Sequence, residues 1–579
     1  MIYASARAIF SKKSIVHLHI WKKSCIFVPE LLCTMKKPVK IALWIVGSLI
    51  VLVAGALLSV NIWASRLVQN EVRKAFVNMP DADAQLGNVY IDLLSGSAIV
   101  RDITFCTYSL ALEDTVSGVR QPGLALHIPT LAIWNINYME LWKNHHLSIL
   151  KITVDEPKLL VYLDEKNPGA LMPVFPKDTT LNKAGAWLRL IDVRHIELKE
   201  LDARLHSTRS PLNLSVDDLS TDCYDIRYDL IDSLFSYNDS VYALSLEACK
   251  IKLPDGRMDL EVHDLKTRNQ GKLSLGYTRV RHIISAKRLA DIMREPTTWI
   301  DLELNSLHTS PLNPIRKVLT QDCTLDALDV DVRRLHVCRD ARHAPKVPYR
   351  TPQEFLRTLP VIFTVKQVKA LAHKVDVEFS STDINCGELH LKNIRAQLKN
   401  ITNRPGAIWY NTAKAPFGEK GQVEAQYNIH MNKAADFDIK IKGTNIETHD
   451  VNSFLRPLVG MTCDCHIDDI DAVYSGNKTT VKGEFCMQYH GLKVKIYKED
   501  DIPYKVITKN ASSFTSFANT LIPKSNPTSV DPAPRRYDVE WQRDEWKPYP
   551  LYLFGPVIDG VMKTMLPGLF VHKQTKKKK

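Results

Sequence analysis

The sequence lacks the short motifs that mark the common catalytic and nucleotide-binding sites. It has no Gly-x-Ser-x-Gly turn, no Walker-type glycine loop, no His-Glu-x-x-His helix and no glycine-rich dinucleotide turn. It also lacks a repeat of fixed period, which argues against propellers and leucine-rich arrays. We therefore predict a protein that is not an enzyme and that needs no cofactor.

Cysteine is scarce and irregularly placed, with 11 residues in a chain of 579. An irregular set of this kind gives no disulfide framework. Most of the cysteines lie in strand-like runs, where a thiol serves as a small core residue. Those after residue 63 are at positions 106, 223, 249, 323, 338, 386, 463, 465 and 486.

Three clusters contain side chains that could bind a metal, and each has a simpler interpretation. Cys463-Asp464-Cys465-His466 brings soft donors together, but no second Cys/His pair with zinc spacing follows it. His145 and His146 lie between an aromatic run and a strand, which favours a polar surface turn over a ligand site or a hydrolase site. The carboxylates from Asp468 to Asp471 alternate with apolar residues, as on the solvated side of a strand. We predict no metal site.

One apolar run, from Ile41 to Trp63, is long enough to span a membrane. It carries no charge, and a helix of this length crosses a hydrocarbon core of about 30 Å. Lys36, Lys37 and Lys40 precede it, so the positive-inside rule predicts a cytoplasmic N-terminus and an exported remainder. A cleavable signal peptide is the alternative, but the apolar part of such a segment is about 7–15 residues long.

Strands of period two dominate the sequence after residue 76. In one example, Phe437, Ile439 and Ile441 alternate with charged residues, which is typical of a strand with one apolar face. One-sided strands favour an antiparallel sheet over the continuously apolar strands of doubly wound folds. The same alternation recurs in Ile196–Leu198, Met258–Val262, Leu328–Val332, Val375–Phe379, Leu389–Leu391 and Leu492–Ile496.

The exported part is too long for one compact core, so it needs several domains or one elongated architecture. We predict a mainly β protein with a few short helices, in which a transmembrane helix precedes a long, twisted, mostly antiparallel sheet that forms an open groove. Helical spacing is confined to Leu67–Met79, Asp450–Leu458 and the C-terminus. The predicted parts are residues 1–34, an over-extended start or short cytoplasmic leader; 35–63, the anchor; 64–166, a helix and strand unit; 167–520, the sheet with a break near 339–352; and 521–579, a linker, helix and basic tail.

The C-terminal segment has the spacing of an amphipathic helix. Phe554, Ile558, Val561 and Met565 recur on one face of that helix. Such a helix either caps the end of the sheet or docks on a membrane surface or partner, aided by the basic run that includes Lys576. The net charge of +12 is otherwise spread along the chain, so we expect membrane phospholipids and no nucleic acid as partners.

The order of the N-terminal segments resembles that of the AsmA-like proteins of diderm bacteria. A basic leader, one span and a short helix are followed by strand-like segments with the same order as in that family. A downstream block, from Phe454 to Val494, is similar as well. The N-terminal segments are Gly87–Asp92, Gly96–Ile103, Leu126–Ile133 and Leu147–Val161.

This resemblance implies an inner-membrane protein whose bulk lies in the periplasm. Members of that family are similar to bridge-like lipid transfer proteins and are linked to phospholipid traffic and outer-membrane assembly, with other envelope proteins as partners. The alternative is a periplasmic scaffold with a closed β core. The residues that we expect to line an apolar groove are Val375, Val377, Phe379, Phe437, Ile439 and Ile441.

Overall fold

The computed structural model describes most of the chain between residue 82 and residue 565, together with parts of an N-terminal helix. The described residues are 48, 59–67, 69–70, 82–107, 122–164, 188–230, 234–268, 271–311, 322–359, 361–380, 387–453, 456, 461–497, 515–516, 518–520, 522–529 and 532–565.

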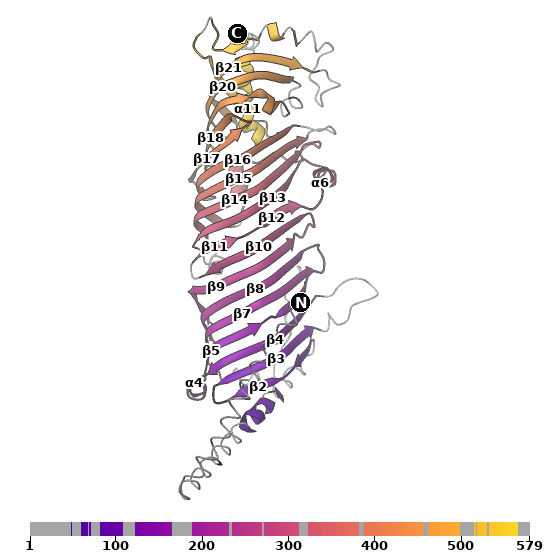
Figure 1. Cartoon of the computed structure of the whole chain (residues 1–579), viewed down its shortest axis with the longest axis vertical. Helices are drawn as coiled ribbons and strands as arrows, with labels where there is room; N and C mark the ends of the chain where they lie inside the picture. The colour runs from indigo at the N-terminus through magenta and orange to yellow at the C-terminus, as the bar shows by residue number, and fades with distance from the viewer. Residues whose placement is uncertain are drawn as a thin grey trace, which may run out of the picture.

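The described part of the chain is built around one sheet of 23 strands (Figure 1). Successive strands lie side by side along the length of the molecule, from β2 near the N-terminal helix to β21 at the other end. Their pairings are antiparallel except β5–β7, β6–β7 and β14–β15, which are parallel. The predicted mainly β class with few short helices is confirmed, and each segment singled out for its alternation lies in a strand.

Most strands from β7 to β21 are longer than β1 and β2, with β11 and β12 as short exceptions. They are β1 Ala82–Leu86, β2 Val89–Asp92, β3 Ser97–Thr107, β4 Gly123–Ile136, β5 His146–Asp155, β6 Lys158–Leu163, β7 Leu190–Ser207, β8 Asn213–Asp229, β9 Leu234–Lys252, β10 Met258–Arg268, β11 Lys272–Leu275, β12 Thr278–His282, β13 Thr297–Pro311, β14 Asp322–Asp340, β15 Ile362–Ser380, β16 Glu388–Thr402, β17 Ile408–Phe417, β18 Gly421–His430, β19 Phe437–Glu447, β20 Met461–Gly476, β21 Thr480–Ile496, β22 Ser525–Asn526 and β23 Arg536–Gln542.

The helices are short, and Figure 1 shows α4 and α6 at the sides of the sheet and α11 at its C-terminal end. No helix within the described ranges is both long and apolar enough to cross a membrane. Most of the predicted span, Ile41 to Trp63, lies outside those ranges. The helices are α4 Tyr138–Asn144, α6 Ala286–Met293, α8 Pro352–Arg357, the 3-10 helix η2 Thr448–Val451 and α11 Tyr549–Met565.

In many long strands, the alternation of protected and exposed side chains shifts by one residue at a position with positive φ. In β16 the protected positions are first Leu389 and Leu391. Lys392 and Asn393 are both exposed, and the even positions from Ile394 to Leu398 are then protected. Asn393 has a φ of 52°, a conformation that asparagine tolerates better than most residues. This irregularity keeps both halves of the strand with their apolar side chains on one face of the sheet. The other mid-strand positions include Asp102, Glu200, Asp218, Asp264 and Asn445.

The sheet continues without a gap across the predicted break at 339–352. β14 and β15 pair in parallel from Asp322 with Ile362 to Asp340 with Ser380. The proline-rich segment is therefore part of the crossover that a parallel pair requires, because the chain must return to the start of β14 before β15 begins. In this crossover Thr351 caps α8 by accepting a hydrogen bond from the backbone N–H of Glu354.

Candidate functional site

An unbroken row of apolar side chains crosses the sheet from β4 to β16. Each member is the direct register partner of the next, so cross-strand neighbours on one face meet side by side. At the usual strand spacing of about 4.8 Å, its ten intervals extend for about 48 Å. We call it the apolar row; its members, one from each of eleven strands, are Leu124, Val161, Leu205, Leu214, Ile251, Leu260, Val280, Leu302, Leu335, Val375 and Leu391.

The apolar row is shielded only in part. Val161 and Val375 are buried, and the other members are half-buried. Figure 1 shows no described helix over the strands from β7 to β12, while α4 and α6 lie at the sides of the sheet. Half-buried side chains in a continuous line, with no described helix over the middle strands, present an extended apolar surface.

The three groove candidates of β15 lie on or beside this row. Val375 is a member of it, and Val377 pairs with Val337 of β14 and Leu389 of β16. Phe379 is half-buried and faces Arg339 of β14, which adds a polar neighbour at the end of the strand. The strand therefore presents the alternating apolar face that its sequence predicts.

The three groove candidates of β19 lie in a different environment. Phe437 is only 1% exposed, and its ring meets the rings of Tyr549 and Tyr552 of α11 at centroid distances of 6.4 and 6.0 Å. Ile439 is buried in the same cluster, and Ile441 packs against it. The expectation that the two strands line one open trough therefore needs correction, because α11 closes the apolar face over β19.

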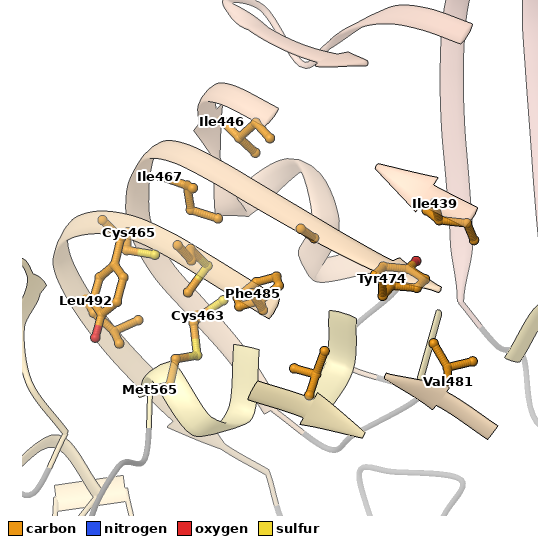
Figure 2. Packing of buried hydrophobic residues seen from close by; sticks show 14 of the residues in the cluster. Ile439, Ile446, Cys463, Cys465, Ile467, Tyr474, Val481, Phe485, Leu492 and Met565 are labelled. Carbon is orange, nitrogen blue, oxygen red and sulfur yellow. The ribbon is translucent and has the colours of Figure 1, made fainter. Parts of the chain in front are cut away.

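This closed core occupies the C-terminal end of the sheet. Figure 2 shows its side chains converging from β19, β20, β21 and α11, with Phe485 near the centre. Burial raises the pKa of Tyr427 and of Tyr489 to about 12, as expected for phenols in a dry environment. The apolar face thus has two parts, one half-buried across β4 to β16 and one closed at the end of the sheet.

Helix α11 is fixed to the sheet by hydrogen bonds as well as by packing. Tyr474 of β20 donates a hydrogen bond from its hydroxyl to the carbonyl of Leu553 at 2.9 Å, and Lys563 donates to the carbonyl of Asp538 of β23 at 3.0 Å. Among the predicted docking residues, Met565 is buried in the closed core and Val561 packs against it. Phe554 and Ile558 are exposed on the other side of the helix, and Lys576 lies outside the described residues.

The candidate metal donors between Cys463 and His466 lie on opposite faces of strand β20. Cys463 and Cys465 of β20 are buried in the closed core, where the hydroxyl of Thr448 donates to their carbonyls. His466 is on the opposite face, with its Nδ1 2.8 Å from Glu447. The hydrogen bond with the neighbouring Cys463 thiol, together with burial, raises the pKa of Cys465, so this thiol stays protonated.

The other two clusters are placed in turns and on the polar face. His145 ends α4 in the left-handed conformation, and His146 begins β5. Asp468 lies 3.0 Å from His490, and Asp471 lies 3.4 Å from Arg536. The two carboxylates therefore have partners on other strands, His490 of β21 and Arg536 of β23.

The face opposite the apolar row carries paired charges. Arg279 of β12 donates two hydrogen bonds to Asp301 of β13, at 3.0 and 2.8 Å. Lys250 of β9 lies 3.1 Å from Glu261 of β10. These cations therefore have carboxylate partners on the next strand.

Asp376 of β15 is a buried carboxylate on that face, only 4% exposed. Its oxygens lie 2.8 Å from His390, 3.1 Å from Lys374 and 3.5 Å from Arg334. Burial alone raises the pKa of Asp376, but the hydrogen bonds from His390 and Lys374 outweigh it and hold the pKa below its usual value.

The sequence matches no family model, and it matches no curated protein. The candidate site therefore rests on the geometry of the sheet. Of the groove residues predicted from the sequence, only Val375 belongs to the apolar row. The row itself was not predicted, because register between strands is set by bulges that alternation within one strand does not reveal.

Proposed function

We propose that the protein binds the acyl chains of phospholipids along the apolar row and does not act as an enzyme. The observation that carries this proposal is the unbroken register of half-buried apolar side chains from Leu124 to Leu391. Each 100 Å² of apolar surface removed from water stabilises a complex by about 2.5 kcal/mol. A row of this length therefore provides a driving force without any reacting group.

The cellular setting belongs to the same proposal. A strand-rich chain behind one apolar run, with the order of segments seen in AsmA-like proteins, favours a single-pass inner-membrane protein whose sheet lies in the periplasm. In that setting an acyl-binding sheet supports phospholipid transport or outer-membrane assembly. The region from β4 to β16 is the open groove of this proposal, and the closed core at α11 is its end.

A scaffold with a closed core is the second candidate. The burial of Phe437, Ile439 and Phe485 beneath α11 favours it for the C-terminal end of the sheet. If a protein partner covered the apolar row in the same way, no lipid would be bound there.

Neighbouring residues of β8 provide a matched test. Leu214 is a member of the apolar row, and Ser215 points to the other face of the same strand. A photoreactive residue at position 214 of the full chain, purified from membranes, is expected to form a covalent adduct with phospholipid, whereas one at position 215 is not. Equal adducts at both positions, or a protein adduct alone at position 214, would overturn lipid binding.

Two matched glutamate substitutions on β8 add a second readout. Leu214→Glu is expected to reduce the phospholipid that copurifies with the protein, because an acyl chain cannot solvate an unpaired carboxylate. Ser215→Glu is the control, since its carboxylate enters a solvated face near Lys250. A Leu214→Glu protein that keeps both its thermal unfolding midpoint and its lipid would contradict the proposal.

A further inference from the structure

A second group of apolar side chains is exposed at the N-terminal corner of the sheet. Trp142 of α4 is 83% exposed, Leu94 in the turn between β2 and β3 is 72% exposed, and Met139 of α4 is 62% exposed. Tyr138 of α4, Leu93 of the same turn and Trp134 near the end of β4 are also exposed. Large apolar side chains at this density on a surface mark a contact with a membrane or a partner. We call these six residues the corner patch.

Backbone contacts hold the two segments of the corner patch together. The N–H of Ile136 donates to the carbonyl of Gly96 at 2.8 Å, and a side chain at Gly96 would clash with that part of β4. Asn137 caps α4 by accepting hydrogen bonds from the N–H groups of Met139 and Glu140. Burial and the nearby charge of Asp92, the last residue of β2, raise the pKa of the Tyr138 phenol.

The same turn is bound to the helix that continues the apolar run. Asn61 Oδ1 accepts a hydrogen bond from the N–H of Leu93 at 3.1 Å, and Ser65 Oγ accepts one from the N–H of Ile91 at 2.8 Å. Gln69 donates to the carbonyl of Gly87 at 2.7 Å. The helix of residues 59–67 and 69–70 therefore runs along β2, and Figure 1 shows it at the same end of the sheet as α4.

These contacts fix where the corner patch lies relative to a membrane-bound apolar run. Asn61 is two residues before Trp63, the end of that run. A helix rises about 1.5 Å per residue, so the turn that Asn61 holds is within a few ångströms of the point where the run leaves the hydrocarbon core. Tryptophan and tyrosine prefer that interfacial level, and the corner patch contains Trp134, Tyr138 and Trp142.

We propose that the corner patch inserts into the headgroup region of the bilayer that holds the apolar run, and that lipid passes there from the bilayer to the apolar row. The second part rests on the proposed lipid binding. Strand β4 links the two sites, because it carries both Trp134 of the corner patch and Leu124, the first member of the row, ten residues or about 33 Å apart. The sheet then stands on the membrane, and β4 leads from the lipid surface to the first member of the apolar row.

Photo-crosslinking of the full chain in vesicles of phosphatidylethanolamine and phosphatidylglycerol tests the insertion. A photoreactive residue at position 142 is expected to form lipid adducts. The same residue at Tyr410, which is exposed on β17 in another part of the sheet, is expected to form none. Adducts at position 142 no more frequent than at position 410, or adducts with protein alone, would overturn the proposal.

A kinetic test addresses the passage of lipid. The double variant Leu94→Ser and Trp142→Ser is expected to slow the loading of a fluorescent phospholipid from those vesicles severalfold, while the amount bound at saturation stays unchanged. Both side chains are exposed, so the unfolding midpoint should not move. Unchanged loading would overturn passage at the corner.

The crosslink from position 214 separates the two proposals. Lipid captured at 214 but not at 142 leaves lipid binding intact and ends the corner proposal. Lipid captured at 142 but not at 214 supports insertion and ends lipid binding in the row.

Discussion

Gly560 of α11 lies directly against the ring of Phe485 of β21. A Cβ atom added at Gly560 would stand 2.2 Å from Phe485 Cγ, far inside van der Waals contact. A Cβ atom added at Gly555, five residues earlier, would stand 2.5 Å from the indole of Trp541 on β23. The helix can approach the sheet this closely only because these two positions have no side chain, and this approach closes the apolar face at its C-terminal end.

Substituting Gly560 by alanine should loosen α11. The added methyl group must displace a buried ring, and overpacking of this kind costs about 1–3 kcal/mol of unfolding free energy. Urea unfolding measures the change. Ile558→Ala on the exposed side of α11 is the control and should change stability by less than about 0.5 kcal/mol. An unchanged or higher stability for Gly560→Ala would show that the helix does not pack as described.

Alanine substitutions should distinguish a buried residue of the closed core from a half-buried residue of β15 beside the apolar row. Phe437→Ala is expected to lower the unfolding free energy by about 3–5 kcal/mol, because it leaves a cavity among buried rings. Val377→Ala removes less volume from a half-buried position of β15 and should cost about 1 kcal/mol. Equal losses in urea unfolding would mean that both positions are enclosed to the same degree.

The stabilising effect of Asp376 should depend on pH. Its pKa is lowered in the folded protein, so its contribution is fully present above its unfolded pKa of about 4 and is lost as the pH falls through the folded value. At pH 7, Asp376→Asn should cost about 1–3 kcal/mol, since it weakens charged hydrogen bonds to His390 and Lys374.

The difference between wild type and Asp376→Asn should shrink on acidification below pH 4, as measured by urea unfolding at several pH values. Asp326→Asn is the control, because Asp326 forms an exposed pair with Lys366 and should contribute about 0–1 kcal/mol. A difference that grows as the pH falls would contradict the lowered pKa.

The phase change in β16 should depend on Asn393. A β-branched side chain is strained at positive φ, so Asn393→Val should destabilise the protein by about 1–2 kcal/mol. Asn393→Gly keeps this conformation accessible and should be close to neutral. The neighbouring Lys392→Val tests the effect of valine without the strain. Thermal unfolding of the three variants decides the matter, and a valine at position 393 as stable as glycine would refute it.

Alternation within single strands was sufficient to predict the mainly β class. Segments such as Phe437 to Ile441 carry that signal locally, because side chains on a strand point to alternate faces. The parallel pairing of β14 with β15 could not be predicted in this way. It depends on a crossover through residues 341–361, whose prolines indicate a break just as well as a connection.

The candidate site was predictable only in part. The strand from Val375 to Phe379 was identified correctly as one-sided, but the different surroundings of Phe437 depend on where α11 lies, which is a tertiary contact. The sequence shows only an aromatic run ending at Trp142 for the corner patch. Such a run is as typical of a buried helix as of an exposed one. Exposure separates the two cases, and exposure follows from the fold.

Nearly every strand from β7 to β21 pairs with its neighbours in the chain, so the position of each strand depends mainly on the strands beside it. An inserted hairpin would lengthen it by two strands, about 9.6 Å, and would disturb only the two strands beside the insertion. In this respect the chain behaves like a solenoid, although its sequence has no repeat. Insertion or loss of single hairpins can therefore change the length of such a sheet in small steps while its N-terminal and C-terminal ends stay the same.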